Sequence, residues 1–346
     1  MSFEVCALNG GRPVFEDSFS SAALGADPAP LVDALHAYGP FDLVLGPAGY
    51  GLPLVPAAEV GERELALMVL KRADEPEAGA GIAGMRTIVR ALIAAGMPLV
   101  FGPGAIHLPT VPEHRKWNRV DLGTADKVAS VALGIADQAE RLGIGYDETT
   151  FVLLELGGAF SAAMAVDGGR IVDGLGGSSG PIGARACGAL DGEAAYLIGG
   201  ALSKRTLFSG GALDPDGSVD LSARGALGRL REDASARDGW LALEEGAAKA
   251  VRALTASVPA PREVLVSGRL AATPGLLESL GERLAAVAPV RSALAVKSAA
   301  RGAALLADGL SGGTHAPLVE RMRLREASGG VLDHLRMYGA QRIELG

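Results

Sequence analysis

A pair of glycines, Gly157-Gly158, interrupts an otherwise apolar segment near the middle of the chain. A strand that bends at two glycines leaves backbone N–H groups uncovered by side chains, so the oxygens of a phosphate can approach them. Nearby hydroxyl groups would add donors, and they occur at Ser161, Ser178 and Ser179, the last directly before Gly180. The segment predicts a phosphate-binding turn, although glycines of this kind also form hairpin turns that bind nothing.

Charged residues concentrate just before and within a predicted helix over residues 124–142. A carboxylate at the start of a helix stays ionised beside the positive end of the helix dipole, where it could act as a base or hold Mg²⁺ through water. The other interpretation is that Asp121 or Thr124 caps the helix and Asp126 only interacts with its dipole. The candidate catalytic residues are Arg119, Asp121, Asp126 and Lys127, and the candidate metal ligands are Asp121 and Asp126.

A third group of interest is Ser267-Gly268, which follows a predicted buried strand over residues 262–266. A strand that ends in small residues lets a flat ring or a ribose lie against the backbone. The small residues of the predicted helix 299–308 are explained by close packing on a sheet. Neither GxxxxGK[ST] nor a GxGxxG that follows a strand and opens a helix is present, which excludes the P-loop and Rossmann classes.

The elements that must position these residues occur in the same order in both halves of the chain. Each half begins with a predicted hairpin and continues with helices that alternate with single strands. The two hairpins turn at Asn9-Gly10-Gly11-Arg12 and at Asp167-Gly168-Gly169-Arg170. The pattern predicts an α/β protein with a duplicated architecture and two domains, 1–145 and 146–346.

The proposed repeat carries one further expectation. Aligning the halves at their hairpin turns places Met1 opposite Ala159, so the strand 151–156 and the Gly157-Gly158 turn have no counterpart in the first half. We therefore expect the N-terminal domain to lack its first strand and first glycine turn.

At these residues the chain resembles the acetate and butyrate kinase branch of the actin-like ATPase superfamily. Closer still is its resemblance to an uncharacterised, largely archaeal and bacterial family of predicted butyrate kinases. Residues 156–163, the turn 167–173 and Gly180-Pro181 are similar to the second phosphate motif of butyrate kinases, and 265–268 to their adenosine motif. Residues 299–306 are similar to the helix that closes the adenosine pocket, and 118–127 to a signature of the family itself.

The resemblance implies a duplicated ribonuclease H-like (actin-like ATPase) two-domain fold that binds ATP and Mg²⁺ between its halves. Gly157, Gly158 and Ser161 would cradle phosphates, and Ser267 and Gly268 would line the adenosine pocket. Asp121 or Asp126 would orient the metal or the acceptor, while Arg119 or Lys127 would neutralise the transferred group. Two departures stand out: the first phosphate motif, Asp-x-Gly-Thr, is missing, and the Gly-Pro-Phe-Ser-Pro-Glu-Arg run of butyrate kinases is replaced by residues 180–185.

Composition narrows the function classes. The formal net charge of -8 and the absence of a basic run argue against a nucleic-acid or anionic-membrane partner. Two distant cysteines suit a reducing cytosol, and no apolar stretch approaches the roughly 20 residues of a membrane span. We expect a cytoplasmic protein whose partner is a small-molecule acceptor, and a homodimer is left open.

Three functions remain open from the sequence. The first is an ATP-dependent phosphotransferase (kinase) acting on a small carboxylate acceptor in a butyrate kinase-like manner. The second is an ATPase or nucleotide sensor that couples cleft closure to a protein partner, since a fold does not determine a function. The third is an inactive remnant, as the missing first phosphate motif suggests.

Overall fold

The computed structural model describes residues 2–75, 82–221, 225–292 and 298–346. They form two compact units, each built from more than one segment of the chain. The first unit comprises residues 1–120, 124–136 and 299–346, and the second comprises residues 121–123 and 137–298. Helix α6 (Ala125–Leu142) therefore begins in the first unit and ends in the second.

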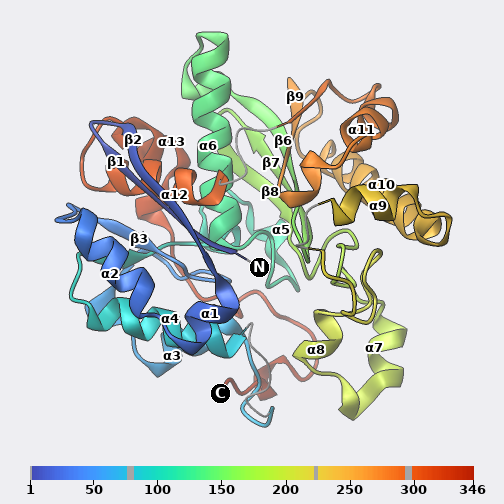
Figure 1. Ribbon diagram of the computed structural model, residues 1–346, viewed down its shortest axis with the longest axis horizontal. Coiled ribbons are helices and arrows are strands. Elements are labelled where there is room, and N and C mark those ends of the chain that lie inside the picture. Colours follow the sequence, from blue (N-terminus) through green and yellow to red (C-terminus); the bar gives the residue numbers. More distant parts are fainter. Residues whose placement is uncertain (1, 76–81, 222–224, 293–297) are drawn as a thin grey trace. The chain divides into compact units, whose positions relative to one another are not determined.

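The second unit is organised around a mixed five-stranded sheet with the order β10-β9-β6-β7-β8 (Figure 1). The central strand pairs in parallel with β9 and antiparallel with β7, and β9 and β10 are also parallel. Apart from its first residue and Glu155 the central strand is apolar, and its side chains are buried on both faces of the sheet. The strands are β6 (Thr150–Leu156), β7 (Ser161–Asp167), β8 (Arg170–Leu175), β9 (Glu263–Ser267) and β10 (Val290–Ser292).

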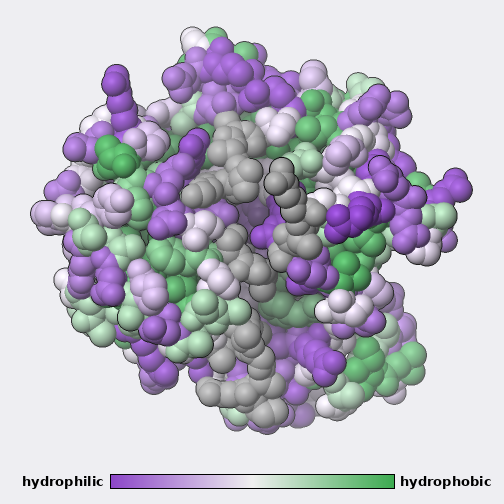
Figure 2. Space-filling model, viewed as in Figure 1, coloured by the Kyte–Doolittle hydropathy of each residue, from purple (hydrophilic) through white to green (hydrophobic). Residues whose placement is uncertain are grey.

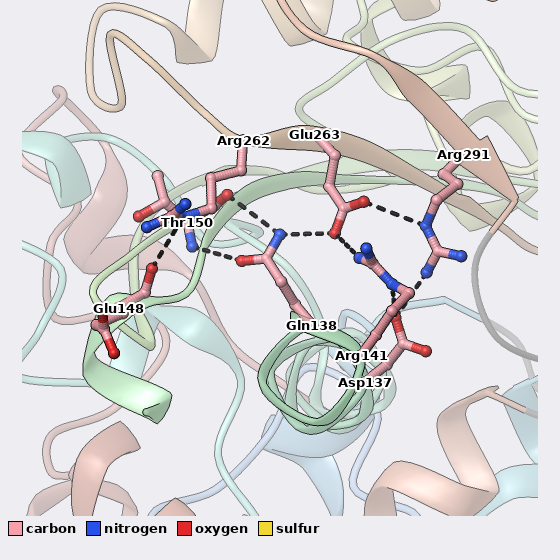
Figure 3. Close-up of polar contacts among 8 residues, drawn as sticks. All are labelled: Asp137, Gln138, Arg141, Glu148, Thr150, Arg262, Glu263 and Arg291. Carbon is pink, nitrogen blue, oxygen red and sulfur yellow. Dashed lines mark hydrogen bonds and ion pairs between the residues drawn. The ribbon is translucent and has the colours of Figure 1, made fainter. Parts of the chain in front are cut away.

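Helices α10 (Arg237–Leu254) and α11 (Leu276–Leu284) share one apolar core with the sheet. Along α10, Leu243, Ala247 and Val251 recur every four residues, so one stripe of the helix is buried. The end of α6 meets the sheet through polar contacts to Glu263 on β9 (Figure 3). The strand-to-helix segment between β8 and α10 contains α7 (Gly192–Ile198), α8 (Lys204–Leu207) and α9 (Ala226–Glu232).

No residue of helix α7 is buried. Tyr196 and Leu197 are both 79% exposed. Figure 2 shows apolar atoms where Figure 1 places this helix. The helix therefore presents an apolar surface of its own.

The first unit contains two smaller sheets. Its N-terminal hairpin, β1 (Ser2–Asn9) with β2 (Arg12–Ser20), is a two-stranded sheet. In the three-stranded sheet, β5 (Leu99–Phe101) lies between β3 (Val44–Gly46) and β4 (Val55–Pro56). Leucines of α2 and of the two following helices pack with Phe101 of β5 in a single core. The remaining elements are α1 (Ser21–Ala26), α2 (Ala29–Tyr38), α3 (Glu62–Val69), α4 (Ile82–Ala94), α5 (Glu113–Lys116) and α13 (Ala316–Met322).

The small-residue helix α12 (Ser298–Leu310) packs against α6 within the first unit. A methyl group on Gly302 would lie 1.8 Å from the carbonyl oxygen of Ala129, so only glycine permits this approach. Arg301 also forms a two-pronged ion pair with Glu16 on β2. The prediction of close packing is confirmed, but the surface that requires the small residue is a helix and not a sheet.

Both units contain an antiparallel hairpin followed along the chain by a parallel pair of strands. These are β1-β2 and β3-β5 in the first unit, and β7-β8 and β9-β10 in the second. In the second unit β6 lies between hairpin and pair and joins them into one sheet. Among the described residues of the first unit no strand joins the two, and the sheets are separate.

The two predicted hairpins and the predicted helices 124–142 and 299–308 are present within a few residues of the expected bounds, the helices as α6 and α12. The elements that were not predicted are helices α1, α3, α5, α8, α9, α11 and α13 and strands β4 and β10. The boundaries 1–145 and 146–346 stay a prediction, because the compact units follow packing and include residues 299–346 in the first. Within the described ranges no helix has both the length and the apolar character needed to span a membrane.

Candidate functional site

The loop between β6 and β7, residues 157–160, lies at the carboxyl end of the central strand. The N–H of Gly157 donates to the carbonyl oxygen of Phe160 at 2.9 Å and closes the turn. No acceptor among the described residues receives the N–H groups of Gly158, Ala159 or Phe160. Gly157 and Gly158 are partly exposed, so the bend is not sealed in the core. The turn offers three successive peptide donors to an anion.

The back of this turn is held by a neighbouring loop. The carbonyl oxygen of Ala159 accepts from the N–H groups of Arg185 and Ala186, both at 3.1 Å. A methyl group on Gly183 would lie 2.1 Å from that same oxygen. The loop therefore fixes the turn without using its free donors.

The end of β9 lies directly beside the turn. Gly268 has a φ of 88°, and a methyl group there would lie 2.4 Å from the carbonyl oxygen of Leu156. Both facts require glycine. Ser267 is opposite Glu155 in the strand register and is 1% exposed, and its hydroxyl has no hydrogen-bond partner among the described residues. The structure thus brings the predicted phosphate turn and the predicted adenosine motif together.

Ser161 occupies a different position from the one expected. It starts β7 on the same face as Ala163 and Ala165, which belong to the apolar core with α10. The residue is 1% exposed, and within the part of the chain that the structure describes its hydroxyl has no hydrogen-bond partner. Donation by Ser161 to a phosphate stays a prediction that requires the turn to rearrange.

Glu155 is a candidate functional residue that the sequence reasoning did not select. Its Oε1 lies 3.9 Å from the position that a methyl group on Gly157 would take, so the carboxylate flanks the turn. A signal was available, because Glu155 is the one charged residue in the apolar run Thr150–Leu156 and it stands two positions before the glycines.

Asp121 and the glycine-rich segment after β8 form a tight cluster in the second unit. The Asp121 carboxylate accepts from the N–H of Gly123 at 3.1 Å and from both the N–H and the hydroxyl of Ser178, at 3.0 and 2.9 Å. The hydroxyl of Ser179 donates to the carbonyl oxygen of Asp121. A methyl group on Gly176 would lie 1.8 Å from Oδ1. Asp121 is 3% exposed and anchors this segment.

The other predicted charged residues belong to the first unit. Lys127 donates to Oδ2 of Asp126 at 2.6 Å, and Thr124 donates to its Oδ1. Desolvation by neighbouring atoms acts to raise the pKa of Asp126, but Lys127 and Thr124 outweigh it and hold that pKa below its ordinary value. Arg119 is exposed, and its backbone N–H donates to Lys116. Asp126 is therefore an ionised carboxylate paired with Lys127.

Gly180 has a structural role that the sequence does not reveal. A methyl group there would lie 2.6 Å from the carbonyl oxygen of Gly176, and its own carbonyl oxygen accepts from Ala189. It closes the segment that Asp121 anchors.

Within the described ranges, no three His, Cys, Asp or Glu side chains form a metal-binding group.

The Pro- and Gly-rich loop before α5 buries two basic side chains in the first unit. His107 is 2% exposed, and its Nδ1 lies 3.3 Å from the carbonyl oxygen of Gly104. Lys116 is 7% exposed and donates to the carbonyl oxygen of Leu108 at 3.0 Å. Burial lowers the pKa of Lys116, and burial followed by the charge of Lys116 lowers the pKa of His107 to about 4.

His107 makes the stability of the chain depend on pH. In the unfolded chain its pKa returns to 6.5, so between about 4 and 6.5 the unfolded state binds a proton that the native state does not. Stability is expected to fall by about 3 kcal/mol as the pH is lowered through this window, and His107→Gln should remove that part of the dependence. Urea unfolding at pH 7.5, 6, 5 and 4.5 measures it, with exposed His114→Gln as the control. Equal slopes for His107→Gln and the unmodified chain would contradict the prediction.

Comparison with known proteins places the chain in a family. The model of the family described as Protein of unknown function (DUF1464) matches residues 1–337. The chain belongs to this family. No curated protein matches the sequence of this DUF1464 member.

Solved structures show the fold of the DUF1464 chain. A propionate kinase from Francisella tularensis superimposes with a TM-score of 0.57 at 12% identity, over 85% of this chain and 87% of the other. Acetate kinase from Entamoeba histolytica gives 0.54 at 10% identity, over 79% and 74%, and that from Porphyromonas gingivalis gives 0.52 at 15%, over 79% and 76%. The expected actin-like, ribonuclease H-like fold is confirmed.

Proposed function

We propose that this DUF1464 chain is an ATP-dependent phosphotransferase whose acceptor is a small carboxylate. The observation that supports it is the turn after β6, with three successive N–H groups that no described residue accepts, directly beside the end of β9. Phosphoryl transfer needs mainly positioned donors and cations around the phosphates, and peptide N–H groups supply donors without a conformational cost.

The proposed site has a defined division of roles. The N–H groups of the 157–160 turn bind phosphate oxygens, and Ser267 and Gly268 lie against the adenosine. Asp121, whose carboxylate already accepts three hydrogen bonds, holds the segment that carries Ser178, Ser179 and Gly180. The neutralising role of Arg119 or Lys127, which belong to the first unit, stays a prediction.

The residues at the turn fit a magnesium ion. The Glu155 carboxylate flanks the phosphate-binding turn, where it would repel phosphate oxygens unless a cation lay between them. Mg²⁺ is bound in such sites by one or two carboxylates, water and the phosphates. We propose that Glu155 would hold it; when bound, Mg²⁺ would neutralise phosphate charge. The metal roles of Asp121 and Asp126 stay predictions.

The acceptor class comes from the structural relatives. Their names identify the substrates of those proteins as acetate and propionate, which are small carboxylates. The butyrate kinase-like specificity suggested by the sequence is one member of this class. We therefore propose the class and leave its chain length to experiment.

The proposal is tested by placing a carboxylate inside the turn. A side chain at Gly158 has room, since a methyl group there lies at least 3.8 Å from other atoms, so Gly158→Asp should fold and repel phosphate. Gly192→Asp, at the exposed start of α7 where a methyl group would meet no atom within 4 Å, is the matched control. We expect the unmodified chain to bind ATP·Mg²⁺ in calorimetry and to form an acyl phosphate from acetate, propionate or butyrate. Of the two variants, only Gly158→Asp should lose at least tenfold in ATP affinity and in the rate of acyl phosphate formation. Absence of ATP binding by the unmodified chain would refute the proposal.

A second candidate function is favoured by helix α7, whose exposed Tyr196 and Leu197 offer an apolar surface to a protein partner. In that case the chain is a nucleotide-dependent sensor. ATP hydrolysis without any phosphorylated carboxylate would favour this candidate over the kinase.

A further inference from the structure

Arg269 lies against the phosphate-binding turn proposed above. A methyl group on Gly158 would lie 3.8 Å from its Cδ and Nε and 3.9 Å from its Cζ. The guanidinium therefore flanks the segment whose N–H groups at Gly158, Ala159 and Phe160 have no acceptor among the described residues. Both parts lie within the second unit.

The backbone explains why this side chain is held in place. Gly268, with its φ of 88°, lets the chain pass within contact distance of Leu156 at the end of β6. Leu270, on the other side of Arg269, is fully buried in the core shared with α10. Arg269 opens the short 3-10 helix Arg269–Ala272 between these two fixed positions.

Arg269 differs from several other arginines of its unit in its partners. Arg141, Arg185, Arg231 and Arg291 each pair with a carboxylate that is buried or partly buried. For Arg269, no hydrogen bond or ion pair joins the guanidinium to any residue that the structure describes, although the residue is partly buried. A partly buried cation without a partner is costly, and an anionic ligand would remove that cost.

We propose that Arg269 is the cation that neutralises the nucleotide phosphates at the 157–160 turn, which rests on the proposed function. The planar guanidinium stays charged and can bind two phosphate oxygens at once, while three peptide N–H groups bind from the turn. The positive charge of Arg269 favours the binding of a nucleoside di- or triphosphate over that of an uncharged nucleoside. The alternative is that the stem of Arg269 only covers the turn by packing.

Three variants of purified full-length chain separate charge from packing. Arg269→Ala removes both the charge and the packing of the side chain. Arg269→Gln keeps most of the aliphatic part without the charge, and Arg269→Lys keeps the charge without the planar guanidinium that can bind two oxygens. Arg262→Ala is the matched control, because Arg262 is exposed, lies at the opposite end of β9 and donates through its side chain to the carbonyl oxygen of Glu148. Thermal unfolding reports whether each variant folds.

The measurement is the Kd for ATP·Mg²⁺ at three salt concentrations. We expect Arg269→Ala and Arg269→Gln to bind at least tenfold more weakly, Arg269→Lys to be intermediate, and Arg262→Ala to be unchanged. The difference in affinity for ATP·Mg²⁺ between the unmodified chain and Arg269→Gln should become smaller as the salt concentration rises, because salt screens the charge of the phosphates.

Two outcomes would overturn the proposal, and a third is distinct. Wild-type affinity in Arg269→Gln shows that the charge is not used, and a loss in Arg269→Ala alone, independent of salt, shows packing only. In both cases ATP still binds the unmodified chain, so the proposed function survives. If the unmodified chain does not bind ATP, both proposals fail together.

Discussion

Replacing Asp121 by alanine is expected to lower the free energy of unfolding by about 3–5 kcal/mol. The carboxylate is 3% exposed and accepts three hydrogen bonds, two of them from Ser178. Bonds to a charged group contribute about 1.5–3 kcal/mol each, and removal of the acceptor leaves the donors of Gly123 and Ser178 unsatisfied. Urea unfolding, with equal m-values for the two chains, measures the loss.

Asp126→Ala is the matched control for this loss. Asp126 is five positions further along the chain, its side chain is half exposed, and its main partner is Lys127. Water screens the half-exposed carboxylate of this pair, so we expect Asp126→Ala to cost about 1 kcal/mol, clearly less than Asp121→Ala. If Asp126→Ala costs as much as Asp121→Ala, the anchoring role assigned to Asp121 is wrong.

A double-mutant cycle with Gly176 tests the contact itself. A methyl group on Gly176 would lie 1.8 Å from Oδ1 of Asp121, so Gly176→Ala alone must displace the carboxylate. In the Asp121→Ala background that obstacle is gone, and the same substitution should cost clearly less. Additive costs would show that the two residues do not meet in solution.

The Asp121 cluster shows what local sequence cannot provide. From local sequence alone, a carboxylate just before a helix could cap the helix, bind a metal or take part in catalysis. Which applies depends on Ser178, 57 positions away, whose hydroxyl is its partner. Only the chain path that brings residues 121–123 into the second unit reveals the pairing.

Local pattern was sufficient where the determinants are local. Glycine pairs with positive φ at the turns of both hairpins, and the apolar runs beside them, predict β1-β2 and β7-β8 correctly. Strand β10 was missed because it has three residues and includes Arg291, so its apolar signal is weak. The fold followed from the order of such elements together with the family resemblance.

The site was predicted in part for the same reason. The Gly157-Gly158 turn and the Ser267-Gly268 strand end are each visible locally, and the structure places them side by side. Glu155 and Arg269 gain significance only once β9 is known to pair with β6, a contact between segments more than one hundred residues apart. Before that, Arg269 is one arginine among many.

Loss of Glu263 is the second large effect that we expect, again about 3–5 kcal/mol of unfolding free energy for Glu263→Ala. Glu263 begins β9 and is 6% exposed. Its carboxylate accepts from Gln138 at 2.6 Å, from Nε of Arg291 at 3.1 Å and from Arg141 (Figure 3). Removing it leaves Arg141 and Arg291 close together, with Asp137 as the carboxylate that both contact.

Charge balance provides the control for Glu263. Glu245→Ala removes an exposed carboxylate that pairs with Lys249 one helical turn away, and it should cost no more than about 0.5 kcal/mol. Adding Arg141→Ala to Glu263→Ala should recover part of the loss, because one of the two uncompensated cations is then absent. A double variant that is as unstable as the sum of the single variants would contradict the ion-pair explanation.

Glu263 also bears on the nucleotide site, because it and Ser267 are the two ends of one five-residue strand. Glu263 and its partner Gln138 fix the first end of β9 to α6. The pairing of β9 with β6 then fixes the position of the other end, where Gly268 and Arg269 follow. If this coupling is real, Glu263→Ala should weaken ATP binding most at temperatures near its lowered melting point and little well below it. A loss of affinity that is equal at all temperatures would instead mean that the geometry of the turn does not depend on the anchor at the other end of the strand.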